Sequence, residues 1–326
     1  MNLVKRIKMG AERFNFDFDT AGLSAYADMN SDELFRRAVT TGRTLSLIRI
    51  QDGVKGTEKI KLLNDSVTYQ LADDCAMTAD GNSTIFTDRD LTTLKIGFYK
   101  QFCQDDLAGF WTRLQLKAGA MAENETLIFE QELMDYILEI HAFELEKMVW
   151  QGDSSLVAGN LQFIDGLATR MSADASVING NPLGAGAMTS SNAYTAFLSV
   201  ARSIPSTIYD QADTKIFCGR EYFNFLKDDL FAQNLYHVPV ASQEDNTMVL
   251  PATGFTVEMV QGLSGYDAIF AGRSQDLIWG TDLATDSGSV ELWYDKDSDT
   301  IKIRSKFYGG TQYPFSDQLV KWIPVP

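Results

Sequence analysis

The sequence predicts an α+β protein organised around one long helix. A helical pattern runs without Gly or Pro from residue 123 to residue 150, with apolar residues recurring at steps of three and four. Strand-like segments fill residues 45–102 before it, and alternating helices and strands follow it from residue 189. With 326 residues, 45% of them apolar, the chain can bury a sizeable core in one large or two modest domains.

Composition excludes several classes of protein. The net charge of −16 argues against broad binding to a phosphate backbone, because that affinity comes from Lys and Arg. No apolar run reaches the roughly 18–20 residues of a membrane helix, so we expect no membrane partner. The start of the chain, Met1–Lys8, lacks the apolar stretch of an export signal, and Cys75, Cys103 and Cys218 have no paired spacing. We therefore expect a protein of the reducing cytoplasm.

The segment before residue 31 is expected to be an extended arm. It carries early basic residues and then the acidic, Phe-rich stretch 15–19, with too little periodic apolar content to fold alone. Ser31 can cap a short helix that ends near Gly42, with acidic residues in its first turn. Residues 45–50 alternate between apolar and polar side chains, which predicts a lead-in strand.

A long, partly exposed β-excursion follows this strand. Short strands are predicted over 60–63, 67–71 and 84–87, and one long strand over 91–102, rich in β-branched and aromatic residues. The Asp80-Gly81 pair marks a tight turn between them.

The region after the long helix begins with an irregular, Gly- and Ser-rich connection up to residue 188. Ser190 then caps a helix through residue 204, and a strand over 214–218 precedes a second helix over 220–232. Strands are predicted over 257–260, 268–271 and 277–280, then a hairpin over 290–310 and a last short strand over 319–322.

Catalytic signals are weak throughout the chain. His141 and His237 are its only histidines, and neither sits in a nucleophile or metal motif; His141 faces the apolar side of the long helix and is interpreted as a packed side chain. The acid pairs 73–74, 105–106 and 228–229 are adjacent residues, which usually point apart. The Gly-rich stretch 180–187 lacks the features of a phosphate loop. We predict no enzyme, no metal and no cofactor.

The long helix carries many acids against a single lysine, Lys147. Beyond the first turn these acids gain nothing from the helix dipole. We expect these acids either to face solvent or to pair with basic groups of another subunit.

Two short motifs carry a family resemblance. The long helix ends in residues 144–153, ELEKMVWQGD, which lead to the segment 163–167, FIDGL, and the chain closes with 307–313, FYGGTQY. Together with the order of arm, β-excursion, unbroken helix, α/β unit and returning hairpin, they resemble the major capsid proteins of tailed bacteriophages of the Hong Kong 97 type.

The resemblance implies a domain organisation. An N-terminal arm would span 1–30, a short helix and lead-in strand 31–49, and an extended loop 50–98. A peripheral domain would comprise 99–179 and 286–326, with its spine helix over 123–150, and an axial domain would span 180–285.

The resemblance also implies a structural function. Copies of the chain would form pentamers and hexamers of an icosahedral shell around double-stranded DNA, assembled in the host bacterial cytoplasm and present in the virion. Separate scaffolding, portal and decoration proteins are possible partners, and the packaged DNA would be contacted weakly and without sequence specificity. The expected inter-subunit contacts lie in the arm, the loop and the spine helix, at Phe16, Phe18, Lys59, Lys61, Tyr69, Glu130, Glu139 and Glu146.

Two alternatives stay open at this point. An encapsulin-like nanocompartment shell would share the fold and bind an enzyme cargo on its inner face. A cytosolic metal-dependent hydrolase would need several acids that converge in one cleft.

Overall fold

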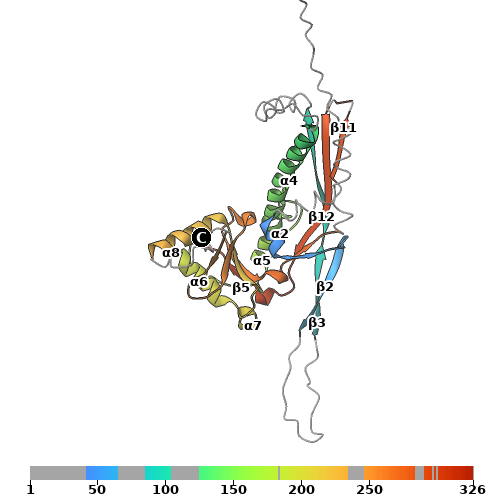
Figure 1. Ribbon diagram of the computed structural model, residues 1–326. Helices are drawn as coiled ribbons and strands as arrows, with labels where there is room; N and C mark the ends of the chain where they lie inside the picture. The colour runs from blue at the N-terminus through green and yellow to red at the C-terminus, as the bar shows by residue number, and fades with distance from the viewer. Residues whose placement is uncertain are drawn as a thin grey trace, which may run out of the picture.

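The protein consists of two units that meet at the C-terminal end of a long helix (Figure 1). The computed structural model describes residues 42–64, 85–103, 125–182, 184–233, 246–282, 290–295, 297–298 and 300–325. One unit is tall and contains the helix α4 (Glu125–Gln151) beside long strands, and the other is an α/β unit. Helix α4 confirms the helix predicted over 123–150.

The α/β unit is built on a sheet whose strands follow the order β5-β13-β9-β6-β8-β7 in the described part of the chain. Helices α6 (Ala193–Ser203) and α8 (Arg220–Ala232) pack on each other, and α6 also contacts strands β9 and β13. A short helix α7 (Ser206–Tyr209) leads into the central strand. The strands are β5 (Ile178–Asn179), β6 (Thr214–Cys218), β7 (Thr247–Val249), β8 (Thr256–Met259), β9 (Ile269–Arg273) and β13 (Val320–Trp322).

The tall unit contains a sheet whose strands follow the order β1-β10-β12-β11, and β4 also pairs with β12. Odd-numbered residues of β12 from Ile301 to Phe307 are buried and the even-numbered ones between them are more exposed, because successive side chains of a strand point to opposite faces. The buried face of this sheet packs on α4. The strands are β1 (Arg49–Gln51), β4 (Leu94–Cys103), β10 (Ile278–Gly280), β11 (Val290–Asp295) and β12 (Thr300–Gln312).

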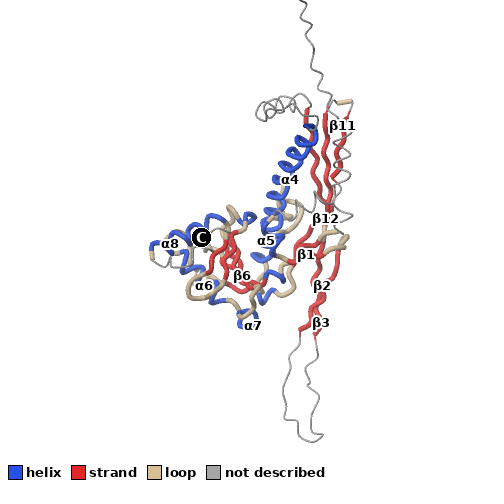
Figure 2. The backbone as a smooth tube through the Cα atoms, viewed as in Figure 1, coloured by secondary structure: helices blue, strands red, loops and turns tan. Residues whose placement is uncertain are grey.

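A third pair of strands, β2 (Thr57–Asn64) and β3 (Ile85–Thr92), forms an antiparallel hairpin. It projects away from the end of the tall unit nearest the α/β unit (Figure 2). These strands confirm those predicted over 60–63 and 84–87, whereas the one predicted over 67–71 lies outside the described residues.

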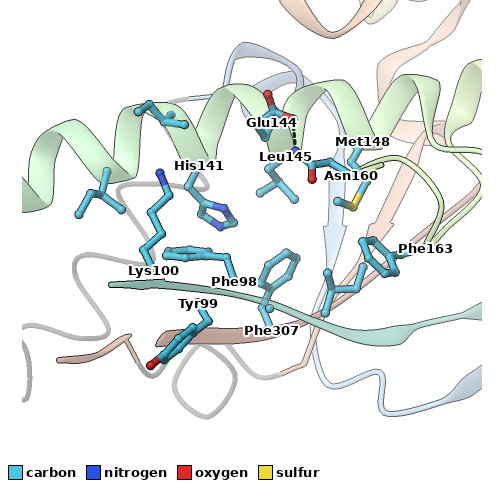
Figure 3. Close-up of a pocket in the computed structure, with 14 residues that line it drawn as sticks. Phe98, Tyr99, Lys100, His141, Glu144, Leu145, Met148, Asn160, Phe163 and Phe307 are labelled. Atoms are coloured by element: carbon cyan, nitrogen blue, oxygen red, sulfur yellow. Dashed lines mark hydrogen bonds between the residues drawn. The ribbon is translucent and has the colours of Figure 1, made fainter. Parts of the chain in front are cut away.

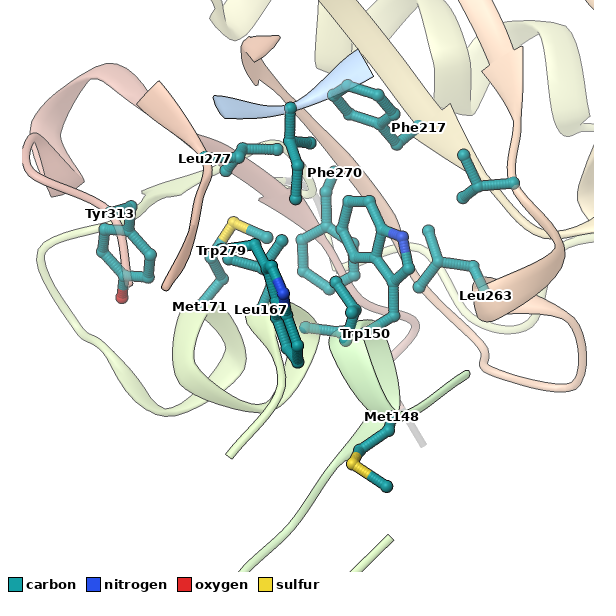
Figure 4. Close-up of a cluster of buried hydrophobic side chains, with 14 of the residues drawn as sticks. Met148, Trp150, Leu167, Met171, Phe217, Leu263, Phe270, Leu277, Trp279 and Tyr313 are labelled. Atoms are coloured by element: carbon teal, nitrogen blue, oxygen red, sulfur yellow. The ribbon is translucent and has the colours of Figure 1, made fainter. Parts of the chain in front are cut away.

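Trp150 belongs to the hydrophobic core that joins the two units (Figure 4). Its indole is fully buried, with its ring centroid 5.4 Å from that of Phe217 and 6.1 Å from that of Phe270. Phe217 and Phe270 belong to β6 and β9 of the α/β unit, while Trp279 of β10 joins the same cluster from the tall unit. The last turn of α4 therefore packs against both sheets and holds them together.

The chain crosses itself directly after this turn. Gly166 N donates a hydrogen bond to Gly152 O at 2.8 Å, and a Cβ atom built on either glycine would lie 2.3 Å from a backbone oxygen of the segment it crosses. Only glycine fits at such a distance, which explains the Gly-Asp and Asp-Gly pairs of the sequence motif. The crossing leads into helix α5 (Leu167–Ala173), which the sequence analysis missed because the surrounding segment lacks periodicity.

The lead-in strand predicted over residues 45–50 is wrong in its first half. Residues Arg43–Leu47 form the short helix α2, and the strand β1 comprises only Arg49–Gln51. Tertiary contacts decide this conformation: Thr44 Oγ1 donates to Glu146 at 2.7 Å and accepts from Trp150 Nε1 at 2.8 Å, both on α4. Six residues that alternate between apolar and polar also fit a short helix, so the pattern alone does not distinguish a strand from a helix here.

Other boundaries also differ from the prediction. The long strand predicted over 91–102 is interrupted at Thr93, which separates β3 from β4. Strand pairing crosses the predicted division into domains at three points: β10, inside 180–285, joins the tall unit, whereas β5, inside 99–179, and β13, inside 286–326, join the α/β sheet. The helix predicted after Ser31 lies outside the described residues. Among the described helices, none is both long and apolar enough to cross a membrane.

The glycine crossing yields the first prediction. Gly152→Ala or Gly166→Ala forces the two backbone segments apart, and we expect each to destabilise the unassembled subunit by about 1–3 kcal/mol in urea unfolding. Gly186→Ala is the matched control, because a Cβ there would lie no closer than 3.7 Å to its neighbours. Equal unfolding midpoints for all three variants would contradict the account.

Candidate assembly surfaces

The β2–β3 hairpin is anchored at its base and exposed along its strands. Thr93 joins the base through its backbone N–H, which donates to Gly56 O at 2.7 Å, and through its hydroxyl, which donates to Val54 O at 2.9 Å. Val54, Leu91 and Ile278 form a small buried cluster beneath it. Among the described strands, β2 and β3 pair only with each other, so both present a free edge to the outside.

Arg89 is the second anchor of the hairpin. Its guanidinium donates to Ser316 Oγ at 2.8 Å, forms an ion pair with Asp174 at 3.3 Å and lies 4.9 Å from the centre of the Tyr313 ring. The Tyr313 hydroxyl also donates to Asp174, at 3.0 Å. Burial opposes ionisation of Asp174, yet hydrogen bonds from the Ser176 backbone and Tyr313, together with Arg89, keep the pKa of its carboxyl below the usual value.

The exposed side of the β4–β12–β11 sheet carries basic and aromatic side chains. Lys302 and Arg304 pair with Asp295 and Glu291 of β11, and the hydrogen bond from Lys302 contributes most to lowering the pKa of Asp295 to about 2. Arg304 also lies over the Trp293 ring, 5.4 Å from its centre, an arrangement that favours a cation. These two pairs balance in charge, and the exposed Lys95 and Lys306 on the same face give it a net positive charge.

His141 of α4 faces the opposite, inner side of this sheet (Figure 3). Its ring centroid lies 4.9 Å from that of Phe98 and 5.3 Å from that of Phe307. Burial lowers the pKa of His141 to about 4, so the imidazole is neutral at physiological pH. This packed environment agrees with the interpretation of His141 made from the sequence.

Buried acids of the described residues serve the fold. Asp229 accepts hydrogen bonds from Tyr194 N and Gln233 Nε2, whereas its neighbour Asp228 is exposed, so this acid pair points apart as expected. Glu258 pairs with Arg43 and Lys215, both at 2.7 Å. Within the described ranges, no group of three His, Cys, Asp or Glu side chains is placed to hold a metal ion.

Solved structures with the same architecture are phage capsids and related particles. A chain of the satellite phage P4 procapsid including size determination (Sid) protein superposes with a TM-score of 0.56 at 11% identity, covering 90% of this chain and 98% of that one. The capsid of an empty GTA particle gives 0.55 at 11% identity, with 88% and 90% covered. Gordonia phage Cozz gives 0.54 at 13% identity, with 87% and 86% covered.

This chain has the Hong Kong 97-like capsid fold. No protein-family profile matches the sequence, and no curated protein matches it either. The Hong Kong 97-like fold is thus shared with chains whose sequence identity is too low for sequence comparison to detect a match. At such identities the burial pattern and the chain topology are retained, although most individual residues differ.

The predicted contact residues occupy different environments in this Hong Kong 97-like subunit. Lys59 and Lys61 are exposed on β2, and the pKa of Lys59 is raised by its hydrogen bond to Asp88 at 2.7 Å. Glu139 is exposed on α4. Phe16, Phe18 and Tyr69 lie outside the described residues, as does the side chain of Glu130.

Glu146 was expected at a contact between subunits, and the structure gives it a different role. Its side chain is buried within its own subunit and accepts hydrogen bonds from the Thr44 hydroxyl and, at 3.4 Å, the Thr44 N–H. The acid-rich sequence of the helix did not distinguish this residue from Glu139, because the difference depends on where α2 packs. Sequence reasoning also missed Arg89, whose only signal is a cation between two acids in a strand, Asp88-Arg89-Asp90.

The Arg89 anchor yields the second prediction. Arg89→Met keeps much of the packing but removes the bonds to Ser316 and Asp174, so we expect hydrogen exchange in peptides covering 85–92 to accelerate roughly tenfold, about 1.4 kcal/mol. Lys59→Met is the matched control, since the Lys59–Asp88 pair is exposed and such pairs contribute little. Similar exchange in both variants would show that Arg89 does not anchor the hairpin.

The third prediction concerns pH. Because His141 is neutral in the fold and its pKa is near 6.5 when unfolded, the unfolded chain binds an extra proton as the pH falls from 6.5 to 4. We expect the subunit to lose stability across this window, by at most about 3 kcal/mol from this group, with no further loss from it below pH 4. Urea unfolding at pH 7.5 and 4.5 should show a smaller difference for His141→Phe than for the wild type.

His237→Gln is the control for the pH measurement, because it removes the only other histidine of the chain. An undiminished pH dependence in His141→Phe would rule out this histidine as its source.

Proposed function

We propose that this chain is the major capsid protein of a tailed bacteriophage, a structural subunit without catalytic activity. Copies of it assemble as pentamers and hexamers into an icosahedral shell that encloses double-stranded DNA. The observation that carries the proposal is the Hong Kong 97-like capsid fold, which extends over about nine tenths of the chain.

The surfaces of the subunit support this function. The anchored β2–β3 hairpin reaches beyond the body of the protein, where it adds contact area that one compact unit does not have. The basic face of the β4–β12–β11 sheet and the exposed Glu139 of α4 are of opposite charge, so neighbouring copies can meet with complementary surfaces. The buried acids Glu146, Asp229 and Glu258 are engaged in internal bonds, as suits a structural subunit.

The organisation proposed for the shell follows the same fold. Residues 50–98 act as the extended loop, 99–179 with 286–326 as the peripheral domain and 180–285 as the axial domain. Strand β10 of the axial segment pairs in the peripheral sheet, and strands β5 and β13 of the peripheral segments pair in the axial sheet. Scaffolding, portal and decoration proteins are separate partners. The packaged DNA is held inside by containment, since the net charge of −16 disfavours tight contact with the wall.

The fourth prediction tests assembly directly. The chain expressed alone should form closed particles, sheets, or rings of five or six in negative-stain microscopy, with matching masses by light scattering after size exclusion. A variant in which Asn-Gly replaces residues 62–87 joins Lys61 to its strand partner Asp88 by a tight turn and should remain folded but unassembled.

The control for this variant keeps the hairpin at full length. Thr57→Ser with Thr92→Ser keeps the exposed hydroxyl pair between the two strands, and we expect it to assemble like the wild type. A wild-type chain that stays a compact monomer or dimer at every concentration would overturn the proposed function.

A further inference from the structure

A cavity of about 310 Å³ lies between α4 and the inner face of the β4–β12 sheet (Figure 3). Its walls are mainly apolar, with Phe98 and Phe307 from the strands, Ile137 and Ile140 from the helix, and Phe163 from the connection between α4 and α5. Phe163 is 43% exposed, so the apolar lining reaches the surface at this end. Open apolar surface of this kind is more stable when another apolar group covers it.

One polar atom in the cavity wall lacks a partner. His141 Nε2 is buried and makes no hydrogen bond to any residue that the structure describes. A buried nitrogen left unbonded is unfavourable, and native proteins usually satisfy it. An occupant that offers both apolar surface and a hydrogen-bonding group would cover this wall and satisfy the nitrogen.

The connection between α4 and α5 carries a matching projection, formed by Leu156 and Val157. Val157 is 95% exposed and Leu156 is 43% exposed, so two adjacent apolar side chains face solvent. Among the described residues, no hydrogen bond engages the backbone N–H or C=O of Val157. The projection thus offers the same two features that the cavity lacks.

Hydrogen bonds hold this projection in place. Asp153 N donates to Leu161 O at 2.8 Å and Ser154 N donates to Asp165 Oδ1 at 2.9 Å, which closes the loop at its base. Asn160 Nδ2 donates to Glu144 Oε2 at 3.0 Å and ties the loop to α4. A pre-ordered projection loses little conformational entropy when it binds.

We propose that the Leu156–Val157 projection of one copy enters the cavity beside His141 of another copy, where its backbone bonds His141 Nε2. The inference rests on the proposed function, because it requires copies of the chain to meet. A second copy is the occupant because the same loop supplies Asn160 and Phe163 to its own cavity wall, while Leu156 and Val157 do not line that cavity.

The fifth prediction tests this contact by cross-linking full-length chains. Ile140→Cys and affinity-tagged Val157→Cys chains are mixed, assembled and oxidised; we expect a disulfide-linked species that contains one chain of each kind. Each single variant assembled alone is the control for Cys75, Cys103 and Cys218, which every variant shares. In parallel, Val157→Asp should reduce particle yield at least tenfold with an unchanged unfolding midpoint, whereas Val157→Ile should assemble normally.

The outcomes separate this inference from the proposed function. Particles that form normally with Val157→Asp and give no mixed disulfide would overturn the contact and leave the capsid function standing. A wild-type chain that forms no particles would overturn both. Particles that show no disulfide but release a small apolar molecule on denaturation would assign the cavity to a ligand and reject the second copy as its occupant.

Discussion

The fold depends on the packing around Trp150 at the end of α4. This one side chain stacks against strands of the α/β sheet, contacts the sheet of the tall unit and donates its indole N–H to Thr44. The glycine crossing beside it lets the chain leave the helix and return without opening the core. A densely packed, buried contact of this kind resists deformation, so the two units keep a fixed relative orientation.

Because the packing around Trp150 is complete within one chain, the β2–β3 hairpin and the Leu156–Val157 loop remain available for other copies. The hairpin is fastened at Thr93 and Arg89 but pairs only within itself beyond that point, and the Leu156–Val157 loop is held away from its own core by its own hydrogen bonds. Under the proposed function, stability and assembly are thereby carried by different residues. This separation suits a subunit that must fold first and then join a large symmetric array.

Much of the fold follows from periodicity in the sequence. The long helix, the strands of the hairpin and the α/β unit have regular patterns of adequate length, so local signals and tertiary packing agree. The sequence pattern predicts a strand at Leu45–Leu47, whereas the structure forms a helix there. Thr44 contacts with Glu146 and Trp150, about a hundred residues away, fix this helix. The same limit applies to surfaces: Glu139 and Glu146 have the same chemistry in sequence, and only the position of α2 makes one exposed and the other buried.

The core is complete within one chain, whereas the hairpin and the apolar loop are proposed to bind other copies. Hydrogen–deuterium exchange, compared between free subunits and assembled particles, distinguishes these two kinds of surface. We expect added protection in residues 57–64, 85–92 and 153–163, with no change in the last turns of α4 or in strands β6 and β9. Protection gained mainly around Trp150, with the hairpin and the loop unchanged, would contradict this expectation.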